Sequence, residues 1–242
     1  MKNSSILFAL SASVLISITA CAEEDKKEIL FRDINWGISY SEVKNILYEY
    51  DWYTMYHDSM MTRSVDEILL GDYKGIDFPN AGFNMIAMPF TDREIDVAGY
   101  ITSGLDLYLA FPVIDGEMVQ DEENAIFYGA RYEFEPEDTE KMYDDLKNKL
   151  SSLYGEPIKD KSETDWIDIV TYTTVWEGAN DTYVSLVADD VPNEEELWPD
   201  SLFISYAWGK GDDYLKSASD AISKKALEEE ASAYGNENVD GL

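Results

Sequence analysis

Residues 135–157 constrain the fold more than any other segment, because a helix start, an apolar stripe and a helix stop agree there. Pro136 suits a first helical turn, where its missing N–H would be unpaired anyway. Apolar side chains then recur at spacings of three and four: Tyr143, Leu146, Leu150, Leu153 and Tyr154. Gly155 can adopt the left-handed conformation that ends helices, and Pro157 cannot continue one. The pattern predicts a surface helix whose apolar side packs on a flat partner.

Segments typical of β-strands lie on both sides of this helix. Apolar or alternating runs, separated by Gly, Pro, Asp and Asn, occupy 83–90, 97–102, 105–114 and 125–134 before it, and 166–176, 183–188 and 202–208 after it. The aromatic-rich segment 51–58 also fits a strand. Because the turns between the runs are short, antiparallel pairing is favoured.

Two further helices precede most of these strands. The capping box Ser39-Tyr40-Ser41-Glu42 predicts a helix from about Tyr40 to Tyr50. The similar pattern in residues 64–67 predicts one or two helical turns that Gly71 stops. The order of helix, strands, helix and strands indicates the α+β class. We expect an antiparallel sheet with helices packed on one face, followed by a C-terminal helix or tail.

The N-terminus has the pattern of an export signal. Residues 1–20 contain one positive charge, an apolar run and small residues at the end. The segment Ile18-Thr19-Ala20-Cys21 resembles the lipobox of bacterial lipoproteins. That resemblance implies cleavage after Ala20 and a lipid, with acyl chains such as palmitate, joined to Cys21 through a thioether. We therefore expect a protein anchored by lipid on the extracytoplasmic side of a bacterial membrane.

These signals divide the chain into a signal peptide (1–20), a tether (21–28), a single globular domain (29–210) and a weakly helical acidic tail (211–242). Removing Lys2 lowers the 18 Lys and Arg to 17, against 50 Asp and Glu, so the mature chain has a formal charge of −33. This charge repels phosphate backbones and anionic lipid surfaces, which excludes a nucleic-acid binder and leaves the lipid as the membrane attachment. Cys21 is the only cysteine, so no disulfide is expected.

The sequence marks no catalytic or metal site, and it predicts no cofactor. His57, the only histidine, is followed by Asp58 and could form half of an acid–base pair. No Gly-x-Ser-x-Gly motif or free cysteine supplies a nucleophile, so we interpret His57 as a histidine without a catalytic role. Oxygen ligands suited to calcium gather in 115–124, 189–196 and 236–241, but none of these completes the twelve-residue calcium loop. We interpret them as solvated acidic loops.

Aromatic residues are abundant, with 17 Tyr, 6 Trp and 9 Phe. Even spacing places Trp166, Tyr172 and Trp176 on one face of a strand, and Tyr206 and Trp208 on one face of another. An open face could bind a sugar or a cation, but we favour a face buried under helices. A second group spans a helix-to-strand corner, and we expect it to be more exposed because not all of its side chains can point inward: Tyr48, Tyr50, Trp52, Tyr53 and Tyr56.

Most of residues 29–208 resemble a group of uncharacterised exported bacterial lipoproteins. The resemblance rests on Phe31 to Trp36-Gly37, on the helix start at residues 39–43, and on Tyr132-Glu133-Phe134 leading into the helix that precedes Gly155-Glu156-Pro157. The layout is more distantly similar to β-lactamase-inhibitor-like and outer-membrane-assembly lipoprotein folds, which bind proteins and catalyse nothing. This implies a non-catalytic binding protein of the cell envelope, whose partner is a protein, peptide or glycan. Two alternatives remain: an envelope-polymer hydrolase using Asp and Glu, and a calcium-dependent adhesion or stability module.

Overall fold

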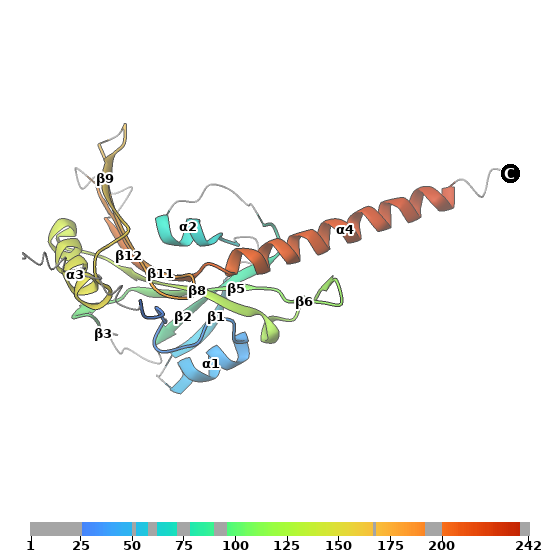
Figure 1. Cartoon of the computed structure of the whole chain (residues 1–242), viewed down its shortest axis with the longest axis horizontal. Coiled ribbons are helices and arrows are strands. Elements are labelled where there is room, and N and C mark those ends of the chain that lie inside the picture. The colour runs from blue at the N-terminus through green and yellow to red at the C-terminus, as the bar shows by residue number, and fades with distance from the viewer. Residues whose placement is uncertain are drawn as a thin grey trace, which may run out of the picture.

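The computed structural model describes residues 26–49, 52–57, 62–71, 78–89, 96–166, 168–191 and 200–237 (Figure 1). The export signal and Cys21 lie outside these residues, so lipid attachment stays a prediction. Within the described residues, no helix is long and apolar enough to cross a membrane.

An eight-stranded antiparallel sheet organises the described part of the chain. Its strands, in spatial order, are β1 (Trp52–His57), β2 (Gly82–Pro89), β5 (Gly104–Ala110), β8 (Ile126–Phe134), β12 (Ser201–Trp208), β11 (Thr182–Asp190), β10 (Val170–Glu177) and β9 (Lys159–Thr164). Smaller elements lie in the connections: β3 (Asp96–Val97), β4 (Tyr100–Ile101), β6 (Val113–Ile114), β7 (Glu117–Met118) and the 3-10 helix η1 (Glu122–Asn124). With the helices, this sheet confirms the predicted α+β class.

Helices cover both faces of the sheet (Figure 1). They are α1 (Tyr40–Glu49), α2 (Val65–Leu70), α3 (Thr139–Tyr154) and α4 (Gly211–Glu237). Leu47 of α1 belongs to the larger core on one face, whereas Ile68 of α2 and Leu215 of α4 belong to a second core on the other. The expectation that helices pack on one face is therefore wrong. Neighbouring side chains such as Leu107 and Tyr108 are both buried, because each face of the central strands is covered.

Helix α3 begins later than Pro136 suggested. Asp138 is its N-cap, and the Asp138 side chain accepts a hydrogen bond from the backbone N–H of Lys141 at 3.1 Å. Leu153, expected in the buried stripe, is exposed. The other stripe residues pack as predicted, since three are buried and the last is half-buried: Tyr143, Leu146, Leu150 and Tyr154.

Residues 26–36 form an N-terminal strap whose apolar side chains belong to the same core as those of α1 and α3. Phe31 is fully buried, and its ring packs against those of Phe127, Tyr132 and Tyr206, with centroid distances of 6.2, 5.4 and 5.7 Å. Trp36 stacks on Phe127 at 5.1 Å. Aromatic contacts of this kind add to the stabilisation from area burial alone. The strap is therefore part of the domain core.

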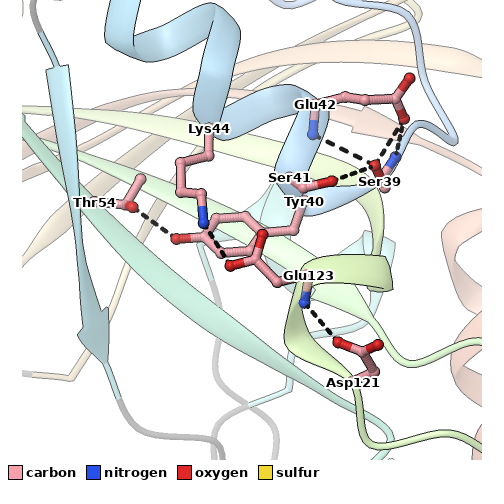
Figure 2. A network of polar contacts seen from close by, with 8 residues as sticks. All are labelled: Ser39, Tyr40, Ser41, Glu42, Lys44, Thr54, Asp121 and Glu123. Carbon is pink, nitrogen blue, oxygen red and sulfur yellow. Dashed lines mark hydrogen bonds and ion pairs between the residues drawn. The ribbon is translucent and has the colours of Figure 1, made fainter.

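Figure 2 shows the contacts that fix the start of α1. The backbone N–H of Glu42 donates to Oγ of Ser39 at 3.4 Å, and the backbone N–H of Ser39 donates to the Glu42 carboxylate at 3.0 Å. The Tyr40 hydroxyl donates to Oγ1 of Thr54 in β1 at 2.6 Å, and Lys44 pairs with a glutamate of η1. These contacts confirm the predicted capping box and join α1 to strand β1.

Helix α4 starts in the core and then leaves the domain (Figure 1). Leu215 and Ala218 are buried, whereas Leu227 is 67% exposed. The predicted weak helix is therefore a continuous one from Gly211 to Glu237, with its first turns packed on the sheet. Residues 238–242 lie outside the described residues.

Candidate functional site: a groove beside helix α2

Helix α2 forms one wall of the candidate site, and its own sequence fixes both of its ends. The backbone N–H of Glu67 donates to Oγ of Ser64 at 3.3 Å, and the backbone N–H of Ser64 donates to the Glu67 carboxylate at 2.9 Å. Gly71 follows the helix with a φ of 73°, which residues with a Cβ rarely adopt. The predicted capping box and the predicted stop at Gly71 are confirmed.

Contacts from distant parts of the chain hold α2 on the sheet. The backbone N–H of Val65 donates to Oδ1 of Asp212, in the first turn of α4, at 2.8 Å. Arg131 of β8 is buried and donates from Nη2 to the carbonyl oxygen of Ile68 at 2.7 Å. Gly129 lies beneath the helix, where an added Cβ would be only 3.0 Å from Cδ1 of Ile68. A glycine at 129 therefore lets α2 approach the sheet closely.

A groove, here called the α2 groove, runs between α2 and β9, above β10 and β11. It consists of two cavities of about 500 and 470 Å³ that share Leu70 as a lining residue. Val175 and Leu69 are buried and form the floor, whereas Ile158 is 56% exposed at the rim. The groove thus combines an apolar floor with an open top, a combination common in binding sites.

The larger cavity, here called the Asp212 cavity, is lined by more acidic than basic groups. Carboxylates of Asp66, Asp181 and Asp212 line it together with the ammonium group of Lys159. Burial raises the pKa of Asp212, and the hydrogen bond from Val65 N–H opposes this rise, while neighbouring carboxylates add to it. A cation entering this cavity would relieve the repulsion among the carboxylates.

Asp181 is held in one orientation at the end of the Asp212 cavity. The Tyr183 hydroxyl donates to Oδ1 of Asp181 at 2.6 Å, and this hydrogen bond together with burial raises the pKa of Tyr183 to about 12. The backbone N–H of Gly209 donates to the Asp181 carbonyl at 2.7 Å. An added Cβ on Gly209 would lie 2.1 Å from Oδ2 of Asp181, so the carboxylate packs directly on the glycine.

The smaller cavity, here called the Lys161 cavity, lies over the opposite end of β9 and β10. Lys161 and Glu163, which form an ion pair, line it together with Asp165 and threonines of β9 and β10. The Asp165 carboxylate accepts a hydrogen bond from the backbone N–H of Ile169 at 3.0 Å, which closes the turn between the two strands. Charges of both signs therefore line this end of the groove.

The structure leaves the predicted acid–base pair untested. His57 lies opposite Asn84 in the register of β1 and β2, but its side chain and Asp58 lie outside the described residues.

The predicted acidic loops 189–196 and 236–241 are described only in part. In the first of them, the Asp189 carboxylate accepts a hydrogen bond from the Thr171 hydroxyl at 2.6 Å. Among the described residues, no three His, Cys, Asp or Glu side chains are grouped closely enough to hold a metal ion.

The aromatic predictions divide into two groups. Trp176 is fully buried, and Tyr172 packs on Tyr143 of α3 at a centroid distance of 5.1 Å, so this face is core as expected. Tyr206 also packs against this core, and so does Trp208. Trp166, expected on the same face, instead lies in the turn between β9 and β10 and is 91% exposed. In the group at 48–56, Tyr48 and Tyr53 are exposed as expected and Trp52 is buried, while Tyr50 and the Tyr56 side chain lie outside the described residues.

Comparisons with protein-family models, curated proteins and solved structures found no match to this chain. The resemblance to exported lipoproteins therefore stays a prediction. No sequence pattern predicts the α2 groove, because its lining residues are spread between Val65 and Asp212. The ends of α2 and the strands that carry Val175 and Tyr183 have local sequence signals, but these signals do not show that the elements meet.

Proposed function

We propose that this protein is a lipid-anchored, non-catalytic binding protein of the bacterial cell envelope, and that the α2 groove is its binding surface. The groove is the observation on which the binding role rests, because it offers an apolar floor open to solvent beside exposed charged groups. The lipobox-like sequence ending at Cys21 supports the anchor. The partner is a protein, peptide or glycan of the envelope.

The position of the strap determines how an anchored domain would be oriented. Lys26 is five positions after Cys21, so an extended chain between them spans at most about 18 Å. Lys26 pairs with Glu177, and the backbone N–H of Ala179 donates to the carbonyl of the residue after Lys26 at 2.9 Å. A lipid on Cys21 would therefore keep the turn between β10 and β11 close to the membrane.

This orientation would place the two ends of the groove differently. Asp181, in the turn between β10 and β11, lines the Asp212 cavity, which would lie near the membrane. Asp165, in the turn at the opposite end of β10, lines the Lys161 cavity, which would lie farther out. A partner in the envelope would then reach the groove from its outer end.

Metabolic labelling tests the anchor. We expect the wild type to incorporate labelled fatty acid and to partition into detergent, and Cys21→Ser to incorporate none, because a hydroxyl is a far weaker nucleophile than a thiol. The strap and core are unchanged in this variant, so the domain should still fold. A wild type without label, or a Cys21→Ser protein that keeps it, would show that residues 1–20 are not a lipoprotein signal.

Site-specific photo-crosslinking in cells tests the binding surface. A photoreactive amino acid at Leu70, between the two cavities, should form specific adducts with an envelope component. The matched control is Leu153, which lies on α3 on the other face of the sheet and is exposed. Adducts of equal yield at both positions, or none at position 70, would argue against the groove as the binding surface.

A further inference from the structure

We infer that the α2 groove binds a basic, partly aliphatic segment of a partner polypeptide, with a lysine or arginine side chain in the Asp212 cavity. This inference rests on the proposed binding role and specifies the chemistry of the partner.

The apolar groups of the Asp212 cavity suit the stem of such a side chain. Val65 and Leu69 of α2 and Val175 of β10 line this cavity, and all three side chains are buried. Lysine and arginine have three or four methylene groups below the charge, which pack along apolar surface while the head reaches polar groups. A small inorganic cation could not use these walls.

The polar groups of the same cavity suit the charged head. A carboxylate can accept about four hydrogen bonds. Within the described part of the chain, Asp212 accepts one from the backbone N–H of Val65, and the Asp181 carboxylate accepts one from the Tyr183 hydroxyl. An ammonium or guanidinium group would add donors to acceptors that are already positioned, and charge-assisted hydrogen bonds are the stronger kind.

Charge complementarity selects a cationic polypeptide over other occupants. Five carboxylates and two lysines line the two cavities: Asp66, Asp181, Asp212, Glu163 and Asp165, with Lys159 and Lys161. A second copy of this chain has a formal charge of −32, so long-range electrostatics disfavour it. Nucleic acid and anionic lipid surfaces are disfavoured for the same reason.

The length of the groove suits several residues of an extended chain. Val175 lines the Asp212 cavity and Thr171 lines the Lys161 cavity. These two residues are four positions apart on β10, about 13 Å at roughly 3.3 Å per residue, so a segment of about four to six residues fits. The Lys161–Glu163 ion pair at the outer end would then face the backbone and later side chains of that segment.

Peptide binding to the purified full chain in uncharged detergent tests this inference. The probe is a fluorescein-labelled acetyl-Leu-Lys-Leu-Lys-Leu-Gly peptide, measured by fluorescence anisotropy at physiological ionic strength. One control peptide has both lysines replaced by glutamine, and another has the leucines replaced by serine. We expect the first probe to bind and both controls to bind at least about tenfold more weakly, because charge and apolar contacts act together.

Charge-matched variants separate groove binding from general attraction to an acidic protein. Asp66→Asn with Asp212→Asn should weaken binding of the lysine probe about tenfold. Glu137→Gln with Glu230→Gln removes the same charge from exposed sites outside the groove and should change affinity less than about twofold. Equal weakening by both pairs would overturn the inference.

A gain of affinity provides a test that misfolding cannot mimic. Lys159→Glu adds a carboxylate to the Asp212 cavity and should tighten binding of the lysine probe, whereas Lys216→Glu on the exposed side of α4 should not. If Lys159→Glu leaves the affinity unchanged, the cationic occupant is wrong. A positive crosslink at position 70 with a negative peptide result would leave the proposed binding role standing and reject only the basic partner.

Discussion

The guanidinium of Arg131 donates a hydrogen bond from Nη2 to the carbonyl oxygen of Ile68 at 2.7 Å. It also donates from Nε to Oγ of Ser205 at 3.1 Å, and from Nη2 to the carbonyl of Glu67 at 3.3 Å. A helix as short as α2 leaves most of its last carbonyls without intrahelical donors. Arg131 supplies donors to two of them, so it fixes the wall of the groove to the middle of the sheet.

We expect Arg131→Met to lower the free energy of unfolding by about 2–4 kcal/mol, because buried carbonyls and Ser205 would lose their donor. The stability of Arg131→Lys should lie between those of Arg131→Met and the wild type, since an ammonium group can donate hydrogen bonds but cannot reproduce the planar fork of the guanidinium. Denaturant unfolding measures both values. A loss below about 1 kcal/mol for Arg131→Met would mean that water or side chains replace these bonds.

Gly129 gives a second test of how closely α2 lies on the sheet. In Gly129→Ala, the new Cβ would lie 3.0 Å from Cδ1 of Ile68 and 3.2 Å from Cδ2 of Tyr108. We expect a destabilisation of about 1–3 kcal/mol, which is typical of overpacking a filled core.

Gly104→Ala is the matched control on the same sheet face. Its added Cβ would meet only Oε2 of Glu133, at 3.6 Å, and Gly104 has no positive φ. We expect thermal unfolding to show no loss of stability, and a gain of up to about 1 kcal/mol from the restricted unfolded chain. Equal effects of the two substitutions would contradict the close approach of α2.

The strap should contribute to stability as a core element does. Phe31→Ala removes a fully buried ring with three aromatic neighbours, so we expect a loss of about 3–5 kcal/mol. Leu153→Ala, at a position that is 73% exposed, should change stability by no more than about 0.5 kcal/mol. Chemical denaturation of both variants is the measurement. A small effect of Phe31→Ala would show that the strap detaches without disturbing the core.

Local signals in the sequence were sufficient for much of the fold. Ser39 with Glu42, and Ser64 with Glu67, form the predicted capping boxes, because such contacts involve residues three positions apart. Most strands also follow their apolar patterns. Strand β9 does not, since Lys159–Thr164 is polar throughout and becomes a strand by pairing with β10. No apolar pattern predicts this strand, and the spacing that predicts Trp166 on a strand is wrong, because Trp166 lies in the turn.

The groove and the second covered face depend on contacts that no local pattern records. Val65 meets Asp212 across 147 positions of the chain. The acidic groups of the cavity are also hidden among 50 Asp and Glu in the sequence. The packing of α2 and α4 beside the turn between β10 and β11 brings Asp66, Asp181 and Asp212 to one cavity. Composition therefore predicts an acidic chain, but it cannot predict where an apolar floor lies beside the acidic groups.

The raised pKa of Asp212 gives a pH-dependent prediction. Burial is the main cause, and nearby carboxylates add to it, so the folded protein holds this proton more tightly than the unfolded chain does. As pH rises from the unfolded pKa, near 3.8, through the folded pKa, the unfolded chain loses its proton first. The free energy of unfolding that Asp212 contributes must therefore fall with rising pH across this window and stay low above it.

Asp212→Asn removes this ionisation but keeps an oxygen that can accept the hydrogen bond from Val65 N–H. We expect its stability relative to the wild type to increase with pH across the same window and then to stay constant. Asp145→Asn is the control, for which stability should change with pH in the opposite direction. Hydrogen bonds from Lys149 and, to a smaller extent, from Tyr100 lower the pKa of Asp145. The wild type should have a higher free energy of unfolding than Asp145→Asn at pH values above the unfolded pKa of Asp145. This difference should disappear as pH falls through the folded pKa of Asp145. Denaturant unfolding at a series of pH values measures the free energy of unfolding of each variant relative to the wild type, and the two variants should show slopes of opposite sign. If this difference does not depend on pH for Asp212→Asn, solvent screens the Asp212 carboxylate in the folded protein.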